Sequence, residues 1–472
     1  MQVNIMNDDT ICAIATPHGM AAIAVVRVSG KDTFPIVNGI FKHTGKPLEL
    51  DGIVSHKAYY GHIVDNDDTL DEVLVSFFKA PHSFTGEDSA EISVHGSVVI
   101  QQRLLEILIA HGARMAEAGE FTRRAFVHRK FDLAQAEAIA DLIASQSEAA
   151  RRVAMNQLKG GFSKELQMLR SKLLDVTSLM ELELDFSEED VEFADRSQLK
   201  NLLDESLNHI TRLTDSFRLG NAIKNGIPVA IVGATNTGKS TLLNALLDEE
   251  RAIVSDIAGT TRDTIEETLN IGGTLFRFID TAGLRETDEV IERIGIERSY
   301  KKLSEADIVV GMLDATKDYG ELREAARSIV ERTDLTQQVL ILLVNKIDQR
   351  EVPQSLCDRL RYDLQIEIGR AEIMLISAKQ QTGLSDLRKV LATCQTAIGT
   401  DATLVTNLRH YEALSKAAEA LQQVRQALND GIPTDLVAQD LRAALYHLGT
   451  ITGEISSDEV LGNIFGRFCI GK

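Results

Sequence analysis

The sequence predicts a multidomain protein: an α+β N-terminal domain, an α-helical domain built from two separated segments, and an α/β domain inserted between them. Three observations predict this organisation. Short apolar runs broken by turn residues fill residues 1–119. Apolar residues recur every three or four positions in 120–220 and 399–472, whereas apolar strands alternate with helical stretches in 221–398. We place the domain boundaries where these patterns change.

The N-terminal segment has the pattern of short strands. Runs such as AAIAVVRVS, DEVLVSFF and AEISVHG contain many β-branched residues, and turn-forming TPHG, TGKP, DNDD and TGED separate such runs. This pattern predicts a compact α+β domain.

Two helical segments flank the α/β block. The first contains LAQAEAIADLIASQSEAARRVAMNQLKGG without a proline, which predicts two or three long helices across 120–220. The final segment is short for an independent bundle, so we favour one helical domain made from both segments. Two independent bundles are the alternative.

The composition is that of a globular protein, with 44% hydrophobic and 25% charged residues. A formal net charge of −20 and the absence of Trp disfavour broad nucleic-acid binding through basic charge or base stacking. Residues 121–172 are the basic exception, with ten Lys and Arg against five Asp and Glu. We therefore expect any RNA contact of this chain near that stretch.

The cysteines give no metal or disulfide pattern, since Cys12, Cys357, Cys394 and Cys469 lie far apart with no C-x-x-C pair. The N-terminal MQVNIMNDDT lacks the basic and apolar regions of a signal peptide, and no run has the length of a membrane span. We expect a cytoplasmic protein with no membrane contact.

The strongest motif is GATNTGKS at Gly233–Ser240, between the strand PVAIV and the helix STLLNALL. In a G-x-x-x-x-G-K-[ST] loop the backbone N–H groups surround phosphates at a helix N-terminus. Lys239 would reach the outer phosphates, and the Ser240 hydroxyl would bind Mg²⁺. The strand–loop–helix context makes a chance match improbable, so we predict a nucleoside triphosphate site.

Three shorter motifs follow in the order of a GTPase. DTAG at Asp280–Gly283 follows a strand and would contact Mg²⁺ and the terminal phosphate. Asp348 of NKID can accept two hydrogen bonds from the N–H edge of guanine, and SAK at Ser377–Lys379 would complete the base pocket. Together these motifs predict GTP and a Ras-like domain. Leu284 occupies the place of the water-orienting glutamine of Ras, so another group must orient the attacking water.

Further stretches resemble the MnmE (TrmE) family of tRNA-modification GTPases. They are ATPHGMAAIAVVRVSG, PHSFTGEDSAEISVHGS, GEFTRRAFVHRKFDLAQAEAIADLI, SDIAGTTRD, DTAGLRETDEVIERIGIERS and the terminal FCIGK. They extend over almost the whole chain, and the terminal Cys-x-Gly-Lys is especially specific. Thr235 departs from the usual G-x-P-N-x-G-K-S loop, and His128-Arg129 replaces an Asn-Gly pair before Lys130.

The resemblance implies a potassium-stimulated GTPase. K⁺ would be held by Asn236, Ser255, Ile257 and Thr260, Mg²⁺ by Ser240 and Thr261, and Glu292 would orient the attacking water. Without the resemblance, Glu292 would be an ordinary charge on a solvated helix face. The expected GTP-binding residues are Asn236, Thr237, Gly238, Lys239, Ser240, Thr241, Ser255, Asp256, Ile257, Ala258, Gly259, Thr260, Thr261, Asp280, Thr281, Ala282, Gly283, Asn345, Lys346, Asp348, Ser377, Ala378 and Lys379.

The resemblance also implies a folate site in the N-terminal domain, holding 5-formyl-tetrahydrofolate or a related folate at a homodimer interface. The matching residues are Arg27, Glu91, Lys130 and Lys472, each of which taken singly would be an ordinary surface ion-pair member. The family implicates its terminal cysteine, here Cys469, in the modification chemistry. A lone buried cysteine is otherwise usually structural.

The resemblance therefore implies an enzyme that acts with the FAD-dependent partner MnmG, in a heterotetramer, on C5 of the wobble uridine of certain tRNAs. The product would carry a carboxymethylaminomethyl group with a folate-derived carbon. A ribosome-assembly or signalling GTPase is the alternative, although it would not need the folate-like domain or CIGK. A folate-dependent transferase with a purely structural nucleotide domain is disfavoured by the intact Mg²⁺ ligands.

Overall fold

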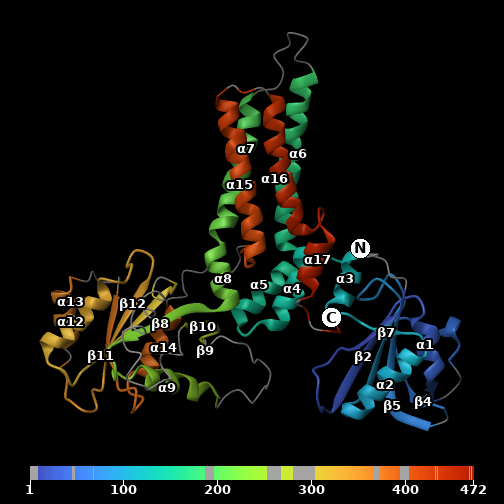
Figure 1. Ribbon diagram of the computed structural model, residues 1–472, viewed down its shortest axis with the longest axis horizontal. Helices are drawn as coiled ribbons and strands as arrows, with labels where there is room; N and C mark the ends of the chain where they lie inside the picture. Colours follow the sequence, from blue (N-terminus) through green and yellow to red (C-terminus); the bar gives the residue numbers. More distant parts are fainter. Residues whose placement is uncertain are drawn as a thin grey trace. The chain divides into compact units, whose positions relative to one another are not determined.

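The computed structural model describes residues 9–44, 48–66, 68–185, 196–251, 267–279, 303, 305–353, 355–365, 371–393, 403–430, 432, 434–466, 468 and 470–471. The chain divides into two compact units. The first comprises Met1–Ala140, Gln157–Leu207 and Lys416–Lys472, and the second comprises Asp141–Asn156 and Asn208–Ser415. No helix in these ranges has an apolar stretch long enough to cross a bilayer. Figure 1 labels many of the helices and strands.

The first unit contains a seven-stranded sheet in the order β3-β4-β5-β6-β2-β1-β7. Neighbouring strands are antiparallel except for the parallel pair β1 and β7. The strands are β1 (Ile11–Ile14), β2 (Ile23–Ser29), β3 (Phe41–His43), β4 (Lys57–Asp65), β5 (Asp68–Phe78), β6 (Ser89–His95) and β7 (Arg114–Met115).

One face of this sheet is buried under α1 (Thr33–Ile40) and α2 (Val98–Ala110). Val26 and Val28 of β2 belong to this core, because alternate side chains of a strand point to the same face. The other face carries polar and partly exposed residues, including Arg27 and the exposed Ile23 and Leu74. Alternation in the sequence therefore produced an α+β domain, as predicted.

The helical part of the first unit joins segments from both sides of the α/β block. Helix α6 (Gly161–Asp185) packs against α16 (Thr434–Thr452), and α7 (Arg196–Asp215) and α15 (Leu408–Asn429) run beside them in Figure 1. Arg170 of α6 forms an ion pair with Glu454, which follows α16. The prediction of one helical domain from two separated segments is confirmed.

The prediction of two or three long helices in 120–220 is met by α6, with 25 residues, and α7, with 20, but it missed four shorter helices. The structure has α3 (Glu120–Val127), α4 (Leu133–Ala144), α5 (Glu148–Leu158), α6, α7 and α8 (Phe217–Asn225) in this stretch. Left-handed backbone at Arg129 (φ 55°) and Gly160 (φ 81°) ends α3 and α5. A continuous helix cannot pass through that conformation.

The second unit contains a six-stranded sheet in the order β13-β12-β11-β8-β10-β9, which is parallel except for the antiparallel pair β9 and β10. The strands are β8 (Ile227–Gly233), β9 (Glu267–Ile271), β10 (Thr274–Ile279), β11 (Ile308–Asp314), β12 (Val339–Asn345) and β13 (Ala371–Leu375). Strand β10 lies on one side of β8 and β11 lies on the other, so the order of the strands reverses at β8. Ligands of such sheets bind at this switch point, beyond the carboxyl ends of the strands.

Helices cover both faces of the second sheet. Side chains of α9 (Lys239–Arg251) and α14 (Leu384–Thr393) share one core with Ile231 and Leu343. Side chains of α12 (Tyr319–Val330) and α13 (Ser355–Asp363) share the other core with Val232 and Leu342. Burial on both faces explains the continuous apolar runs of the sequence. The predicted Ras-like α/β fold is confirmed.

The chain enters and leaves this α/β domain at neighbouring positions. Ser216, just before α8, accepts a hydrogen bond at Oγ from the N–H of Val405 at 3.0 Å. The rings of Phe217 and Tyr411 stack 4.5 Å apart. A Cβ on Gly220 would lie 2.2 Å from the carbonyl oxygen of Val405, so only glycine fits there. Adjacent connections are what an inserted domain requires.

Candidate functional site

The phosphate loop connects β8 to the first turn of α9, at the switch point of the sheet. Asn236 (φ 62°) and Gly238 (φ 99°) adopt the left-handed backbone that turns the loop back over the helix N-terminus. A Cβ on Gly238 would lie 2.3 Å from Nδ2 of Asn345, so a side chain there would push the loop off its neighbour. The Thr237 hydroxyl donates to the carbonyl of Ala234 at 2.8 Å and closes the loop.

Lys239 folds back on this loop. Its Nζ donates to the carbonyl oxygens of Gly233 and Ala234, each at 2.9 Å. Burial lowers the pKa of the ammonium from its ordinary value. A partly desolvated cation beside a helix N-terminus attracts anions strongly, so the loop, Ser240 and Thr241 form a cradle suited to a polyphosphate. The Ser240 hydroxyl in the first turn fits a Mg²⁺ ligand next to such phosphates.

Asn345 joins the phosphate loop to the loop that would hold the base. It lies at the carboxyl end of β12 and is 3% exposed. Its Nδ2 donates to the carbonyl of Thr237 at 2.8 Å, and its Oδ1 accepts from the N–H of Ala378 at 2.9 Å. One side chain therefore satisfies a buried carbonyl and a buried N–H on two separate loops.

The base side of the site is held by a second set of contacts. The Ser377 hydroxyl donates to Oδ1 of Asp348 at 2.6 Å and accepts from the N–H of Gln380 at 3.1 Å. These bonds fix the carboxylate of Asp348, and Lys379 follows in the same loop. The structure thus brings together the NKID and SAK motifs, which are about 30 residues apart in the chain.

Asp314 is a site residue that the motifs did not reveal. It ends β11 directly opposite Asn345 in the strand register, and its Oδ2 accepts from Nζ of Lys346 at 2.6 Å. Burial opposes ionisation of Asp314, but Lys346 and Thr316 outweigh it and lower the carboxyl pKa. Lys346 has φ 70°, so this ion pair anchors a residue in an unfavourable backbone region. The signal in the sequence is an acidic residue that ends the buried run IVVGMLD.

Fourteen predicted site residues lie outside the described ranges: Ser255, Asp256, Ile257, Ala258, Gly259, Thr260, Thr261, Asp280, Thr281, Ala282, Gly283, Glu292, Cys469 and Lys472. Two strands lie next in the chain to the segments that contain most of these residues. Glu267 begins β9 after the GTTRD segment, and β10 ends at Ile279, immediately before DTAG. Ile279 pairs with Ala230 of β8, so both DTAG and the phosphate loop leave the same end of the sheet.

In the N-terminal domain, Arg27 and Glu91 form an ion pair across adjacent strands. They are directly opposite in the register of β2 and β6, and Nε and Nη2 of Arg27 lie 3.1 and 2.9 Å from Oε1 of Glu91. The guanidinium lies over the ring of Phe84 at 5.0 Å and that of Phe121 at 5.6 Å. Both hydrogen bonds use Oε1, which leaves Oε2 of Glu91 and Nη1 of Arg27 outside the pair.

Lys130 reaches the loop that carries Phe84, where its Nζ donates to the carbonyl of Pro81 at 2.9 Å. It follows the C-terminus of α3, where the Lys130 N–H bonds the carbonyl of Ala125 and the Arg129 N–H bonds that of Phe126, both at 2.9 Å. These two hydrogen bonds form a Schellman motif. Its left-handed position, here Arg129, is usually a glycine. The structure thus brings Arg27 and Glu91 together and attaches Lys130 to the neighbouring loop.

Sequence profiles of two families match the chain. The GTP-binding protein TrmE N-terminus matches residues 10–130, and the MnmE helical domain matches residues 133–469. The chain belongs to the MnmE family. The tRNA modification GTPase MnmE of Flavobacterium johnsoniae is 52% identical over 99% of this chain and 100% of that protein.

The MnmE of Parabacteroides distasonis is also 52% identical, over 98% of this chain and 100% of its own length. Among solved structures, Aquifex aeolicus Era is 29% identical, covers 41% of this chain and 66% of Era, and has a TM-score of 0.27. The resemblance to the MnmE family that the sequence stretches indicated is therefore confirmed over nearly the whole chain.

Proposed function

We propose that this protein hydrolyses GTP and acts in tRNA modification, as the names of its MnmE relatives state for them. The observation that carries the nucleotide half is the Asn345 bridge, which holds the phosphate loop and the Ser377–Lys379 loop against each other. Phosphates and base of one nucleotide could then be bound at a single edge of the sheet. Asp348, fixed by Ser377, supports guanine, because its carboxylate accepts two N–H donors that adenine does not present together.

Hydrolysis is proposed to depend on K⁺. Leu284 has no polar atom that could orient water. The side-chain amide oxygen of Asn236, a residue with left-handed backbone in the phosphate loop, is the proposed first ligand of a monovalent cation, with Ser255, Ile257 and Thr260 as the remaining ligands. A bound K⁺ would offset charge that develops on the phosphates. Mg²⁺ would be held by Ser240 and Thr261, and Glu292 would orient water.

The test compares GTP turnover in potassium chloride and sodium chloride at equal ionic strength. We expect much faster turnover in potassium for the wild type, and no salt preference for Asn236→Ala. Asn225→Ala is the matched control, because Asn225 lies outside the phosphate loop and hydrogen-bonds Asn221. Equal turnover of the wild type in both salts would refute the potassium mechanism, but it would leave the proposal of GTP binding untouched.

A folate is proposed to bind beside Arg27. The Oε2 of Glu91, which the ion pair with Arg27 does not use, suits the N–H edge of a pterin. The Nη1 of Arg27, likewise outside that pair, suits the glutamate carboxylates together with Lys130 and Lys472. Exposed Ile23, Tyr60 and Leu74, on the face of the sheet opposite α1 and α2, support a homodimer there. Calorimetry with 5-formyl-tetrahydrofolate should detect binding to the wild type and weak binding to Arg27→Ala. Arg103→Ala, on α2, is the control, and no heat with the wild type would remove the folate proposal.

The finer chemistry follows the family. We propose that the protein acts with the FAD-dependent MnmG on C5 of the wobble uridine, that a folate-derived carbon enters the carboxymethylaminomethyl group, and that Cys469 participates. Mass spectrometry of nucleosides from tRNA of a deletion strain provides the test. Loss of the modified uridine, restored by wild type but not by Lys239→Ala, is the expected result. Unchanged nucleosides would favour the ribosome-assembly or signalling alternative.

A further inference from the structure

The hairpin β9–β10 connects two motif-bearing segments to a contact elsewhere in the second unit. Gly272 (φ 62°) and Gly273 (φ 86°) form its two-residue turn, which has the positive φ values of a type I′ turn. At the opposite end, β9 follows the GTTRD segment and β10 runs directly into Asp280 of DTAG. The two strands are paired from Ile271–Thr274 beside the turn to Glu267–Phe278 at the other end, so they form one ribbon between the turn and these segments.

The turn of this hairpin is bound to the start of α5. Asn270 accepts the Gly273 N–H at Oδ1 (3.1 Å) and donates from Nδ2 to the carbonyl of Gln146 at 2.9 Å. The carbonyl of Gly273 accepts from the N–H of Ala149 at 3.5 Å. Ala149 lies in the first turn of α5, where backbone N–H groups have no partner within the helix.

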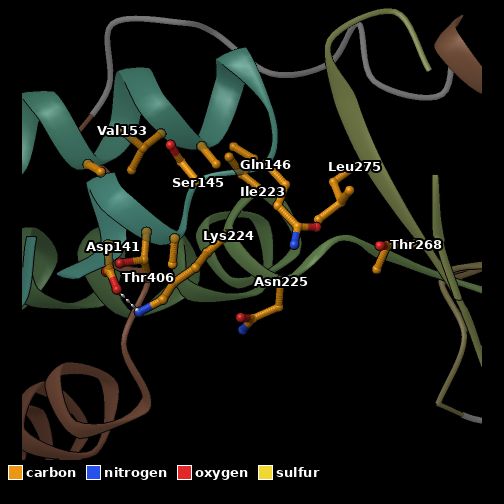
Figure 2. A pocket seen from close by; sticks show the side chains of 13 residues that line it. Asp141, Ser145, Gln146, Val153, Ile223, Lys224, Asn225, Thr268, Leu275 and Thr406 are labelled. Carbon is orange, nitrogen blue, oxygen red and sulfur yellow. Dashed lines mark ion pairs between the residues drawn. The ribbon is translucent and has the colours of Figure 1, made fainter. Parts of the chain in front are cut away.

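A second polar contact lies close to this one. Lys224, in the last turn of α8, forms an ion pair with Asp141 of α4 at 2.7 Å. Figure 2 shows this pair on one side of a pocket of about 250 Å³, with Thr268 and Leu275 of the hairpin on the other. A volume of that size has room for several water molecules. Helix α8 shares the apolar core of the hairpin through Ala222, but no described residue of α4 or α5 belongs to that core, so the hairpin is joined to these two helices by a few directional bonds beside open space.

We propose that Asn270 is the positioning residue that couples the nucleotide-dependent segments to helix α5. A shift of β9 or β10 when nucleotide binds moves the turn, and Asn270 passes that movement to the carbonyl of Gln146 and the first turn of α5. The adjacent pocket lets the contact change without breaking a packed core. This inference rests on the proposed GTP binding, and its test separates the two.

The test uses hydrogen exchange of the full-length protein with and without a non-hydrolysable GTP analogue and Mg²⁺. Two segments are read: 233–242 reports nucleotide binding, and 146–152 contains the Ala149 amide. Asn270→Asp keeps the acceptor for Gly273 but replaces the donor to Gln146 with an oxygen that repels its carbonyl. Asn225→Ala is the matched control, since Asn225 lines the same pocket but bonds Asn221.

In the wild type and Asn225→Ala, the analogue should slow exchange in 233–242 and change it in 146–152. In Asn270→Asp, protection of 233–242 should persist, while 146–152 exchanges about three- to tenfold faster and no longer responds to nucleotide. A purely structural role would speed exchange but leave the nucleotide response. The inference is overturned if the response persists in Asn270→Asp, or if wild-type 146–152 never responds. No protection of 233–242 in the wild type overturns GTP binding and this inference together.

Discussion

Replacing Asn345 with alanine tests whether this side chain holds the two halves of the nucleotide site together. The change removes two hydrogen bonds, to the Thr237 carbonyl at 2.8 Å and from the Ala378 N–H at 2.9 Å, at a position that is 3% exposed. An unsatisfied buried group costs about 1–3 kcal/mol. Because water can enter the space left by the amide, we take the lower end for each group, which gives about 2 kcal/mol in total.

This cost falls on the arrangement that binds nucleotide, so it should appear in affinity. Since about 1.4 kcal/mol corresponds to tenfold in Kd, we expect a fluorescent GDP analogue to bind Asn345→Ala roughly 30-fold more weakly than the wild type. Asn345→Asp should also bind weakly, because its carboxylate keeps the acceptor for Ala378 but repels the Thr237 carbonyl. Asn225→Ala controls for the loss of an exposed amide elsewhere in the same unit.

Fluorescence titration at fixed Mg²⁺ measures these constants, and circular dichroism verifies that each variant is folded. A Kd for Asn345→Ala within twofold of the wild-type value would refute the bridging role. Asn345→Asp binding as tightly as the wild type would show that the bond to the phosphate loop is unimportant, even if the bond to Ala378 matters.

Three further predictions concern the first unit. Arg129→Gly should stabilise this unit by about 0.5–1 kcal/mol, because glycine adopts the left-handed backbone at the end of α3 without strain. Denaturant unfolding of the full chain should then show a higher midpoint. An unchanged or lower midpoint contradicts the prediction. Glu120→Gln should destabilise by about 3 kcal/mol at neutral pH, since it removes the charge of a 1% exposed carboxylate that binds two arginines. Burial raises the pKa of Glu120, but its arginine partners outweigh burial and hold the pKa below its ordinary value. The difference in unfolding free energy between the wild type and Glu120→Gln should therefore disappear as pH falls through that lowered pKa. A difference that persists in acid refutes the ionic explanation. The hydrogen bond that His95 donates to Asp71, and then the charge of Asp71, raise the pKa of His95. NMR should therefore show His95 titrating above its ordinary value, and Asp71→Asn should return it to that value. The stabilisation from this pair is present at low pH and is lost as pH rises through the raised pKa of His95.

The sequence predicted what depends on local pattern. Continuous apolar runs such as QVLILLVN predicted buried parallel strands, and β12 is buried from Leu340 to Asn345. The phosphate loop was predictable because glycine, lysine and serine spacing in GATNTGKS is dictated by backbone conformation and charge. The number of helices in 120–220 was not predictable from apolar spacing, because residue Arg129 takes a left-handed conformation that its side chain does not favour.

The sequence by itself determined the domain order, the Ras-like α/β block, the nucleotide motifs and the family, because each depends on spacing that short stretches preserve. Only the tertiary structure decided which distant residues meet. The contact of Asn345 with Thr237 crosses 108 residues, that of Asn270 with Gln146 crosses 124, and that of Arg27 with Glu91 crosses 64. Such contacts depend on strand order and register, which are set by the packing of whole sheets and are not encoded in the residues that touch.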